Sequence, residues 1–186
     1  MRLTALRIAD PPERWAALGF AIDRGQVGLA EVTLVLGGNP AWSLPPVDGL
    51  ASFKPFDHAP LHEHPNGAIG LDHVVVTTPD FDRTAAALAE AELPLKRIRD
   101  AGGFRQGFRR VGEAILELVE VRGEEPSAPA RFWGLVPVVA DLDALKARLG
   151  EQLSDPKPAV QPGRRIATLR EGAGLGCAVA FMDAAA

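Results

Sequence analysis

Two stretches of the chain share one pattern of hydrophobic and polar positions. LDHVVVTTPDF at 71–81 and FWGLVPVVADL at 132–142 each place a β-branched apolar run before an acidic turn, at an offset of 61 residues. An amphipathic stretch follows each turn, and Gly- and Arg-rich strand and hairpin signals follow that. Self-similarity at a fixed offset indicates a repeated structural unit. The pattern therefore predicts a strand, a helix and about three strands, twice over.

The acidic turns locate the starts of the two helices. Aspartate is a favoured N-cap because its short side chain accepts a hydrogen bond from a free backbone N–H of the first turn. The predicted helices span 82–92, with Asp80 or Asp82 as N-cap, and 142–149, with Asp141 or Asp143.

A fainter copy of the same pattern opens the chain. LTALRIAD (3–10) predicts a strand, PPERWAAL (11–18) a short helix with proline in its first turn, and AEVTLVLG (30–37) a strand. Residues 39–67 are rich in proline and turn formers without a period of 2 or 3.6, which predicts a long connector on the surface. The predicted organisation is a partial β-α-β module at 1–38, a Pro-rich connector at 39–67, and a main domain at 68–183 with modules 68–122 and 130–183.

Composition narrows the classes of function. At 47% hydrophobic and 24% charged residues the chain is an ordinary globular protein, and its net charge of −4 argues against nucleic acid or an anionic membrane as partner. The single cysteine, Cys177, excludes an intramolecular disulfide and a multi-cysteine zinc site. No apolar run has the length of a signal peptide core or a membrane span, so we expect a cytoplasmic protein.

The repeat carries two residues of a known pattern. A tandem β-α-β-β-β repeat with His73 on a first strand (LDHVVV) and Glu117 on a last strand (AILELVE) resembles the glyoxalase / bleomycin-resistance / extradiol-dioxygenase superfamily, the vicinal oxygen chelate proteins. The resemblance implies an α+β fold in which paired modules form a curved mixed sheet around a cavity, with helices on its outer face. It also implies a divalent metal held by His or Gln from each first strand and Glu from each last strand.

The second module lacks the metal ligands that the resemblance implies. Gly134 takes the place of His73, and Ala178 takes the place of Glu117. A catalytic metal normally has at least three protein ligands, so a Zn, Fe, Mn, Ni or Co ion bound by His73 and Glu117 would need a further donor. The missing ligands therefore favour a site without a metal. One source of that further donor is the histidine-rich stretch HAPLHEH (58–64), which contains His58, His62 and His64. The alternative interpretation is that these side chains are solvated in a polar connector.

His73 and Glu117 have two interpretations. Strand alternation gives Ile115, Glu117 and Val119 a common orientation toward the predicted cavity. There Glu117 and His73 would form a catalytic acid–base pair or bind a metal. The alternative is a structural hydrogen-bonded pair left from an ancestral site.

Three further residues are candidates for binding the ligand. Arginine forks suit carboxylate or phosphate groups, and adjacent strand residues point to opposite faces, so at most one of Arg109/Arg110 and one of Arg164/Arg165 can line the cavity. Arg109 and Arg165 are the predicted pair. Trp133, beside the vacant ligand position at Gly134, is predicted to fill the space of the metal or to stack on an aromatic ligand.

Three functions are consistent with these residues. The first is a metal-dependent lyase, isomerase or dioxygenase that uses His73 and Glu117. The second is a metal-free protein that binds or sequesters a small anionic or aromatic molecule without catalysis. The third is a metal-free enzyme with Glu117 as base and His73 as its partner. An odd number of modules leaves the first without a partner in the chain, which predicts either an extension of the sheet or a homodimer.

Overall fold

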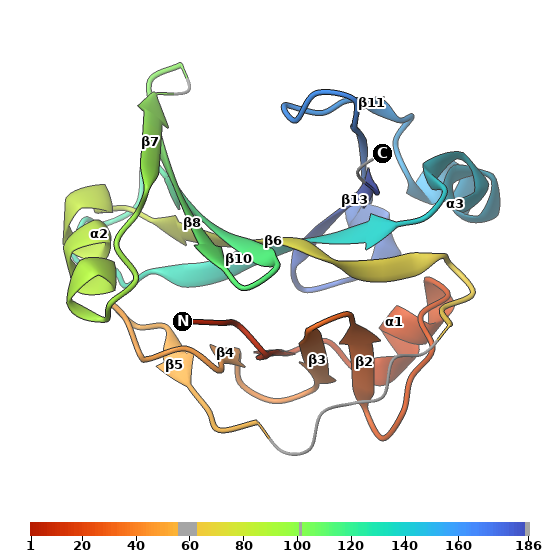
Figure 1. Ribbon diagram of the computed structural model, residues 1–186, viewed down its shortest axis with the longest axis horizontal. Helices are drawn as coiled ribbons and strands as arrows, with labels where there is room; N and C mark the ends of the chain where they lie inside the picture. Colours follow the sequence, from red (N-terminus) through yellow and green to blue (C-terminus); the bar gives the residue numbers. More distant parts are fainter. Residues whose placement is uncertain (56–62, 101, 185–186) are drawn as a thin grey trace.

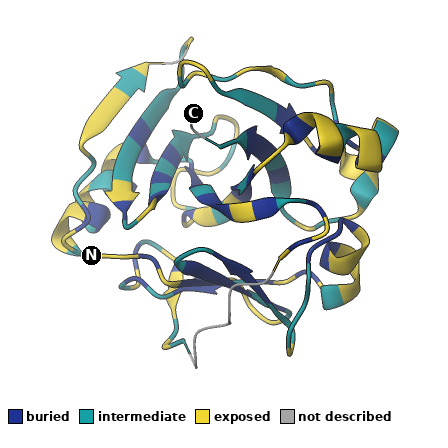
Figure 2. Ribbon diagram, turned by 45° about the vertical axis from the view of Figure 1, so that its right-hand side comes forward, coloured by how far each residue is buried: buried dark blue, intermediate teal, exposed yellow. Residues whose placement is uncertain are grey.

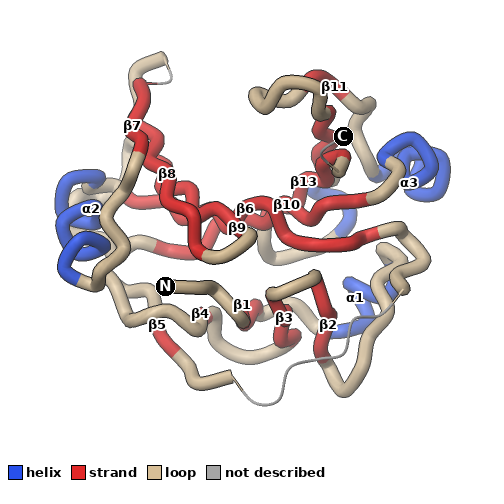
Figure 3. Tube along the Cα trace, in the orientation of Figure 1, coloured by secondary structure: helices blue, strands red, loops and turns tan. Residues whose placement is uncertain are grey.

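Two β-sheets packed face to face make up the protein (Figure 1). This computed structural model describes residues 1–55, 63–100 and 102–184. The larger sheet has eight strands in the order β11-β12-β13-β10-β6-β9-β8-β7, and the smaller has five in the order β2-β3-β1-β4-β5. The larger sheet bends so that its two ends rise on either side of an open space, and helices α2 and α3 lie at its outer flanks (Figure 3). The α+β class and the curved mixed sheet predicted from the sequence are confirmed.

The larger sheet contains both predicted modules. Each runs strand, helix and three strands, as the repeat predicts. Their elements are β6 (Ala68–Thr78), α2 (Phe81–Glu90), β7 (Arg97–Asp100), β8 (Arg105–Val111) and β9 (Ala114–Glu120), then β10 (Arg131–Val139), α3 (Leu142–Leu149), η1 (Gly150–Gln152), β11 (Lys157–Pro158), β12 (Arg165–Thr168), η2 (Glu171–Ala173) and β13 (Ala178–Asp183).

Both long helices begin at the first of the two aspartates proposed for each. Asp80 Oδ1 accepts a hydrogen bond from the backbone N–H of Arg83 at 3.0 Å, and Asp141 Oδ1 accepts one from Ala144 at 2.9 Å. These bonds satisfy N–H groups that have no partner within the helix. The same capping geometry therefore starts the helix in each module.

The central strand pair relates the two modules by a pseudo-twofold axis. β6 and β10 run antiparallel, and Val74 pairs with Leu135, the residue 61 positions later. Each residue of this pair is therefore the repeat counterpart of the other, so the axis passes through the pair. The neighbouring pairs exchange in the same way: they are His73–Val136 and Val75–Gly134.

The first 55 residues supply the smaller sheet. The elements of this segment are β1 (Ala5–Ile8), α1 (Pro12–Ala17), β2 (Gln26–Leu29), β3 (Val32–Leu36), β4 (Ala41–Trp42) and β5 (Ala51–Ser52). β1 is parallel to β3 and β3 is antiparallel to β2, which is the arrangement of β6, β9 and β8 in the first module. The opening segment therefore has the topology of a module with one strand fewer.

One hydrophobic core fills the space between the two sheets (Figure 2). Trp42 and Leu44, from the segment expected to be a surface connector, are completely or almost completely buried in it. The expectation of a surface connector is therefore wrong for these residues, because the segment adds β4 and β5 to the smaller sheet. The opening segment covers the back of the larger sheet within the same chain and does not extend it. The homodimer stays a prediction.

Among the described residues, no helix is long and apolar enough to cross a membrane.

Candidate functional site

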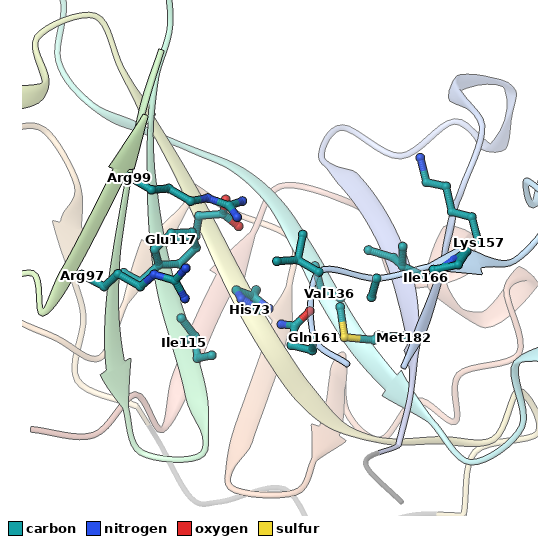
Figure 4. A pocket seen from close by; sticks show the side chains of 14 residues that line it. His73, Arg97, Arg99, Ile115, Glu117, Val136, Lys157, Gln161, Ile166 and Met182 are labelled. Carbon is teal, nitrogen blue, oxygen red and sulfur yellow. The ribbon is translucent and has the colours of Figure 1, made fainter. Parts of the chain in front are cut away.

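The concave face of the larger sheet holds a cavity of about 660 Å³ (Figure 4). His73 and Val136, a directly opposed pair on the central strands, form part of its floor. β7, β8 and β9 of the first module supply one wall, and the segment around β11 and β12 of the second module supplies the other. Cavities of roughly 300–1,000 Å³ accommodate small-molecule ligands. The cavity therefore lies between the modules, as predicted.

Glu117 is the carboxylate of the cavity. It lines the cavity together with Ile115, whereas Leu116 and Leu118 are buried in the core on the other face of β9, as strand alternation predicts. Burial raises the pKa of Glu117, and the nearby His73 lowers it by a smaller amount. The side chain therefore holds its proton more tightly than an exposed glutamate.

An amide holds one oxygen of this carboxylate. Gln106 Nε2 donates to Glu117 Oε1 at 3.0 Å, and Arg99 Nε donates to Gln106 Oε1 at 2.7 Å. Glu117 Oε2 accepts no hydrogen bond from the described residues. The arrangement fixes the carboxylate while one oxygen remains available to a ligand.

Two arginines of β7 line the same wall. Arg97 and Arg99 alternate with the exposed Ile98, so both side chains lie on the cavity face of the strand (Figure 4). Arg99 also stacks over the ring of Phe108, with its guanidinium carbon 5.3 Å from the ring centroid. Neither arginine is among the residues predicted from the sequence, although the alternation of arginine in RIRD is a usable signal.

The second module presents apolar residues where the first is polar. Gly134 pairs with Ala178 in the way that His73 pairs with Ile115. Ala178 is therefore the counterpart of Ile115, and Ala180, two residues further, is the counterpart of Glu117. The assignment of Ala178 to that position is wrong because the second module has two more residues between its first and last strands.

Strand pairing also identifies the counterparts of the other polar residues. Arg99 pairs with Gln106 on β8, and Lys157 pairs with Ile166 on β12. Gln106 and Ile166 each oppose the last-strand residue two positions after the Glu117 position, so they are counterparts, and Arg99 and Lys157 are counterparts as well. The second module has replaced the amide by a hydrocarbon side chain but has kept a cation at the rim.

The charges around the cavity favour an anion. Three cationic side chains, Arg97, Arg99 and Lys157, line it with a single carboxylate, Glu117. Among the described residues, no carboxylate lies within ion-pair distance of Arg97 or Lys157. Clefts lined by one sign of charge attract ligands of the opposite sign. The opposite wall, with Ile166 and Met182, suits an apolar part of the same ligand.

Comparison with solved structures finds the same fold elsewhere. Methylmalonyl-CoA epimerase from Mycobacterium tuberculosis matches with a TM-score of 0.51 and 20% identity over 64% of this chain and 91% of that one. A second methylmalonyl-CoA epimerase structure matches with a TM-score of 0.50 and 19% identity over 64% of this chain and 97% of that one. The two-module part has the vicinal oxygen chelate fold. No family model and no curated protein matches the sequence.

Arg109 does not lie in the cavity of this vicinal oxygen chelate fold. On β8 it pairs with Leu116, whereas its neighbour Phe108 pairs with Glu117. Directly opposed residues of antiparallel strands point to the same face, so Arg109 shares the face of the buried Leu116. Its predicted place in the cavity is therefore corrected, and Arg97 and Arg99 supply the cations of this wall.

Arg165 also points away from the cavity. Its guanidinium donates to both carboxylate oxygens of Asp143 at 3.0 Å and to Asp183 Oδ2 at 2.8 Å. Ile166, the next residue along β12, is the one that lines the cavity. The arginine thus joins α3 to β13, and its predicted place in the cavity is corrected as well.

Trp133 occupies an irregular position on β10. It is the extra residue between the pairs Phe132–Val76 and Gly134–Val75, where the register of the two strands shifts. The residue is 51% exposed and is not among those that line the cavity. The structure therefore does not bring it to His73 and Glu117.

The residues present do not fit the metal centre implied by the fold family. The counterparts of His73 and Glu117 are Gly134 and Ala180, and the described residues contain no group of three or more His, Cys, Asp or Glu side chains that could hold an ion. His64 is remote: its Nδ1 accepts from the N–H of Ala21 at 3.0 Å, and its Nε2 lies 2.7 Å from the carbonyl oxygen of Gly28. His58 and His62 lie outside the described residues.

Metal analysis tests this conclusion directly. We expect less than about 0.1 equivalent of Zn, Fe, Mn, Ni or Co per chain after expression with all five metals, because two protein ligands rarely retain an ion. Elemental analysis of untagged protein, repeated on His73→Ala, measures this. A full equivalent that disappears in the variant would show that ligands outside the described residues complete the site.

Proposed function

We propose that the protein binds a small anionic molecule in its cavity and that Glu117 accepts a proton from that molecule without the help of a metal. The observation that carries the proposal is the division of the cavity into two unlike walls. One wall combines Glu117 with Arg97 and Arg99, and the other is apolar with Lys157 at its rim. The charge pattern supports an anionic ligand with an apolar part, and the carboxylate supports acid–base chemistry.

The proton transfer uses the free oxygen of Glu117. A C–H bond next to a carbonyl or carboxyl group of the ligand breaks, its proton passes to Oε2, and the electron pair stays on the ligand as an enolate. The arginines oppose the negative charge that develops on the ligand, which lowers the barrier. Gln106 holds the carboxylate in place during the transfer, since its amide already donates to Oε1.

A non-catalytic binder is the second candidate. It is favoured by the apolar side of the cavity, where Val136, Ile166 and Met182 offer shape and no reactive group. A binder would use the same cations but would leave the protons of its ligand in place. Exchange of those protons with solvent therefore separates the two functions.

Ligand binding tests what both candidates share. We expect Arg99→Gln and Lys157→Gln each to weaken binding of an anionic ligand about tenfold, because each removes one charge-assisted contact of about 1.5 kcal/mol. Isothermal titration with malonate, methylmalonate, benzoate, inorganic phosphate and methylmalonyl-CoA would first identify a bound probe and then compare the variants. Methylmalonyl-CoA is included because the two solved structures with this fold are named methylmalonyl-CoA epimerase.

The matched control for these variants is Arg110→Gln. Arg110 is an exposed arginine of β8 that donates to the backbone oxygen of Glu113 and does not line the cavity. Its loss should leave binding unchanged. Equal losses in all three variants would mean that net charge alone attracts the ligand, and the proposed site would be abandoned.

A further inference from the structure

A β-bulge brings two adjacent residues of β6 together. Asp72 is the extra residue between the pairs Leu71–Pro137 and His73–Val136, where the register of β6 against β10 shifts. Neighbouring residues of a regular strand point to opposite faces, so their side chains do not meet. A bulge re-aims a side chain. Here Asp72 Oδ2 lies 2.5 Å from Nδ1 of His73.

This contact belongs to a buried chain of three charged or polar side chains. Asp72 Oδ1 accepts a hydrogen bond from Arg164 Nη1 at 2.5 Å, and Arg164 Nε donates to the carbonyl oxygen of Asp183 at 2.7 Å. The side chains of Asp72, His73 and Arg164 are 14%, 8% and 12% exposed. Asp72 Oδ2 and His73 Nδ1 are buried and make no hydrogen bond of regular geometry to the described residues, so this close contact is the polar contact that each of them makes. Within the described part of the chain, the charge or proton of each is therefore opposed by the other alone.

The state of Asp72 decides which ring nitrogen carries the proton. Burial alone would raise the pKa of Asp72, but His73 and Arg164 together outweigh burial and lower it. An ionised carboxylate carries no proton, and two unprotonated atoms would repel each other at this distance, so Nδ1 of His73 must carry the proton at this contact. The other nitrogen, Nε2, then carries the lone pair.

We infer that Asp72 is a positioning residue that holds His73 as the Nδ1–H tautomer and presents Nε2 to the cavity as an acceptor. His73 lines the cavity and Nδ1 is buried against Asp72, so Nε2 is the nitrogen that a ligand can reach. This role of Asp72 adds to the proposed function, and its importance for ligand binding rests on that function. It gives the cavity a second proton acceptor beside Glu117.

Arg164 extends this arrangement to the second module. It lies between β11 and β12, three residues after Gln161, which lines the apolar wall of the cavity. Its bond to Asp72 therefore ties the wall of one module to the histidine of the other. The position of His73 depends on contacts from both modules.

Nuclear magnetic resonance of the imidazole nitrogens tests the inference without any ligand. Protein labelled with ¹⁵N-histidine would be examined at increasing pH until the imidazole nitrogen signals stop changing, and His73 assigned from the His73→Gln variant. We expect a protonated Nδ1 and an unprotonated Nε2 for His73. His64 is an internal reference with the opposite tautomer, because its Nδ1 accepts a hydrogen bond from Ala21.

The variant Asp72→Asn should abolish this preference. An asparagine can donate to Nδ1 through its amide, so we expect the Nδ1–H pattern of His73 to be lost while the signals of His64 stay in place. Asp143→Asn, at an exposed aspartate on α3, is the matched control and should leave His73 unchanged. A wild-type His73 with its proton on Nε2 would overturn the inference, whether or not the variant folds.

The outcome is separable from that of the proposed function. The tautomer is measured in the free protein, whereas the proposed function is tested by binding and by exchange of ligand protons. A correct tautomer in a protein that binds none of the anionic probes would retain the positioning role and refute the ligand class. Binding with the wrong tautomer would do the reverse.

Discussion

Replacement of Glu117 by Gln is expected to slow exchange of ligand protons with solvent by about 10²–10⁴-fold, the usual range for loss of a general base. Gln has nearly the shape of Glu but no basic oxygen, so the ligand still binds and its C–H bond stays intact. Proton NMR in deuterium oxide measures the exchange on bound malonate, methylmalonate or methylmalonyl-CoA, the probes with a C–H bond next to a carbonyl or carboxyl group, as loss of that signal. Binding titrations on the same samples confirm that the cavity is occupied.

Glu113→Gln is the matched control for this variant. Glu113 is an exposed glutamate in the turn between β8 and β9, outside the cavity, and its loss should leave the exchange rate unchanged. If Glu117→Gln exchanges protons as fast as the wild type while binding equally well, Glu117 is not the base. Absence of exchange in the wild-type protein, with tight binding, would favour the non-catalytic binder.

The pH dependence of exchange follows from the environment of Glu117. A general base works in its ionised form, and burial raises the pKa of this carboxyl group above that of an exposed glutamate. The exchange rate should therefore increase as pH rises through this pKa and level off above it, at a higher pH than an exposed glutamate would show. The residual rate of Glu117→Gln should lack this rise.

Patterns of adjacent residues were enough to predict the modules. The offset of 61 correctly relates β6 to β10, because the pseudo-twofold pair Val74–Leu135 is spaced by that number. Period-two alternation correctly oriented Glu117, since it follows from backbone geometry alone. Both are local properties that a sequence records directly.

Features that depend on register were not predictable in the same way. The bulge at Asp72 breaks the alternation and is visible only once β6 is paired with β10. The sequence predicts Arg109 in the cavity because nothing in it shows that Phe108, rather than its neighbour, pairs with Glu117. The burial of Trp42 likewise depends on how the smaller sheet packs on the larger one.

The asymmetry of the modules gives the site its character. Both keep a cation at the rim, Arg99 in one and Lys157 in the other. Only the first keeps the carboxylate and the histidine below that rim. A symmetric metal-binding site needs equal ligands from both halves, whereas a site with one polar wall can orient an amphiphilic anion, with its charge toward the rim and its apolar part on the second module.

An attempt to restore the missing ligand by Gly134→His is expected to lower the free energy of unfolding by about 3 kcal/mol, the upper end of the usual cost of overpacking. A Cβ atom at Gly134 would lie 2.7 Å from the backbone oxygen and 3.2 Å from the Cβ of Ala178 on the neighbouring β13. A backbone oxygen cannot rotate away, so the two strands must separate. Urea denaturation of the variant against the wild type measures the loss.

Gly172→Ala is the matched control, because a Cβ there would meet no atom within 4 Å and the change should cost less than about 0.5 kcal/mol. Gly134→Ala should already show part of the loss, since the conflict arises at Cβ. If Gly134→His proved as stable as the wild type and bound a metal together with His73 and Glu117, the second module would have lost only a side chain. The expected loss of stability instead means that the second module has no space for a metal-binding side chain at position 134. One substitution therefore cannot restore a chelating site.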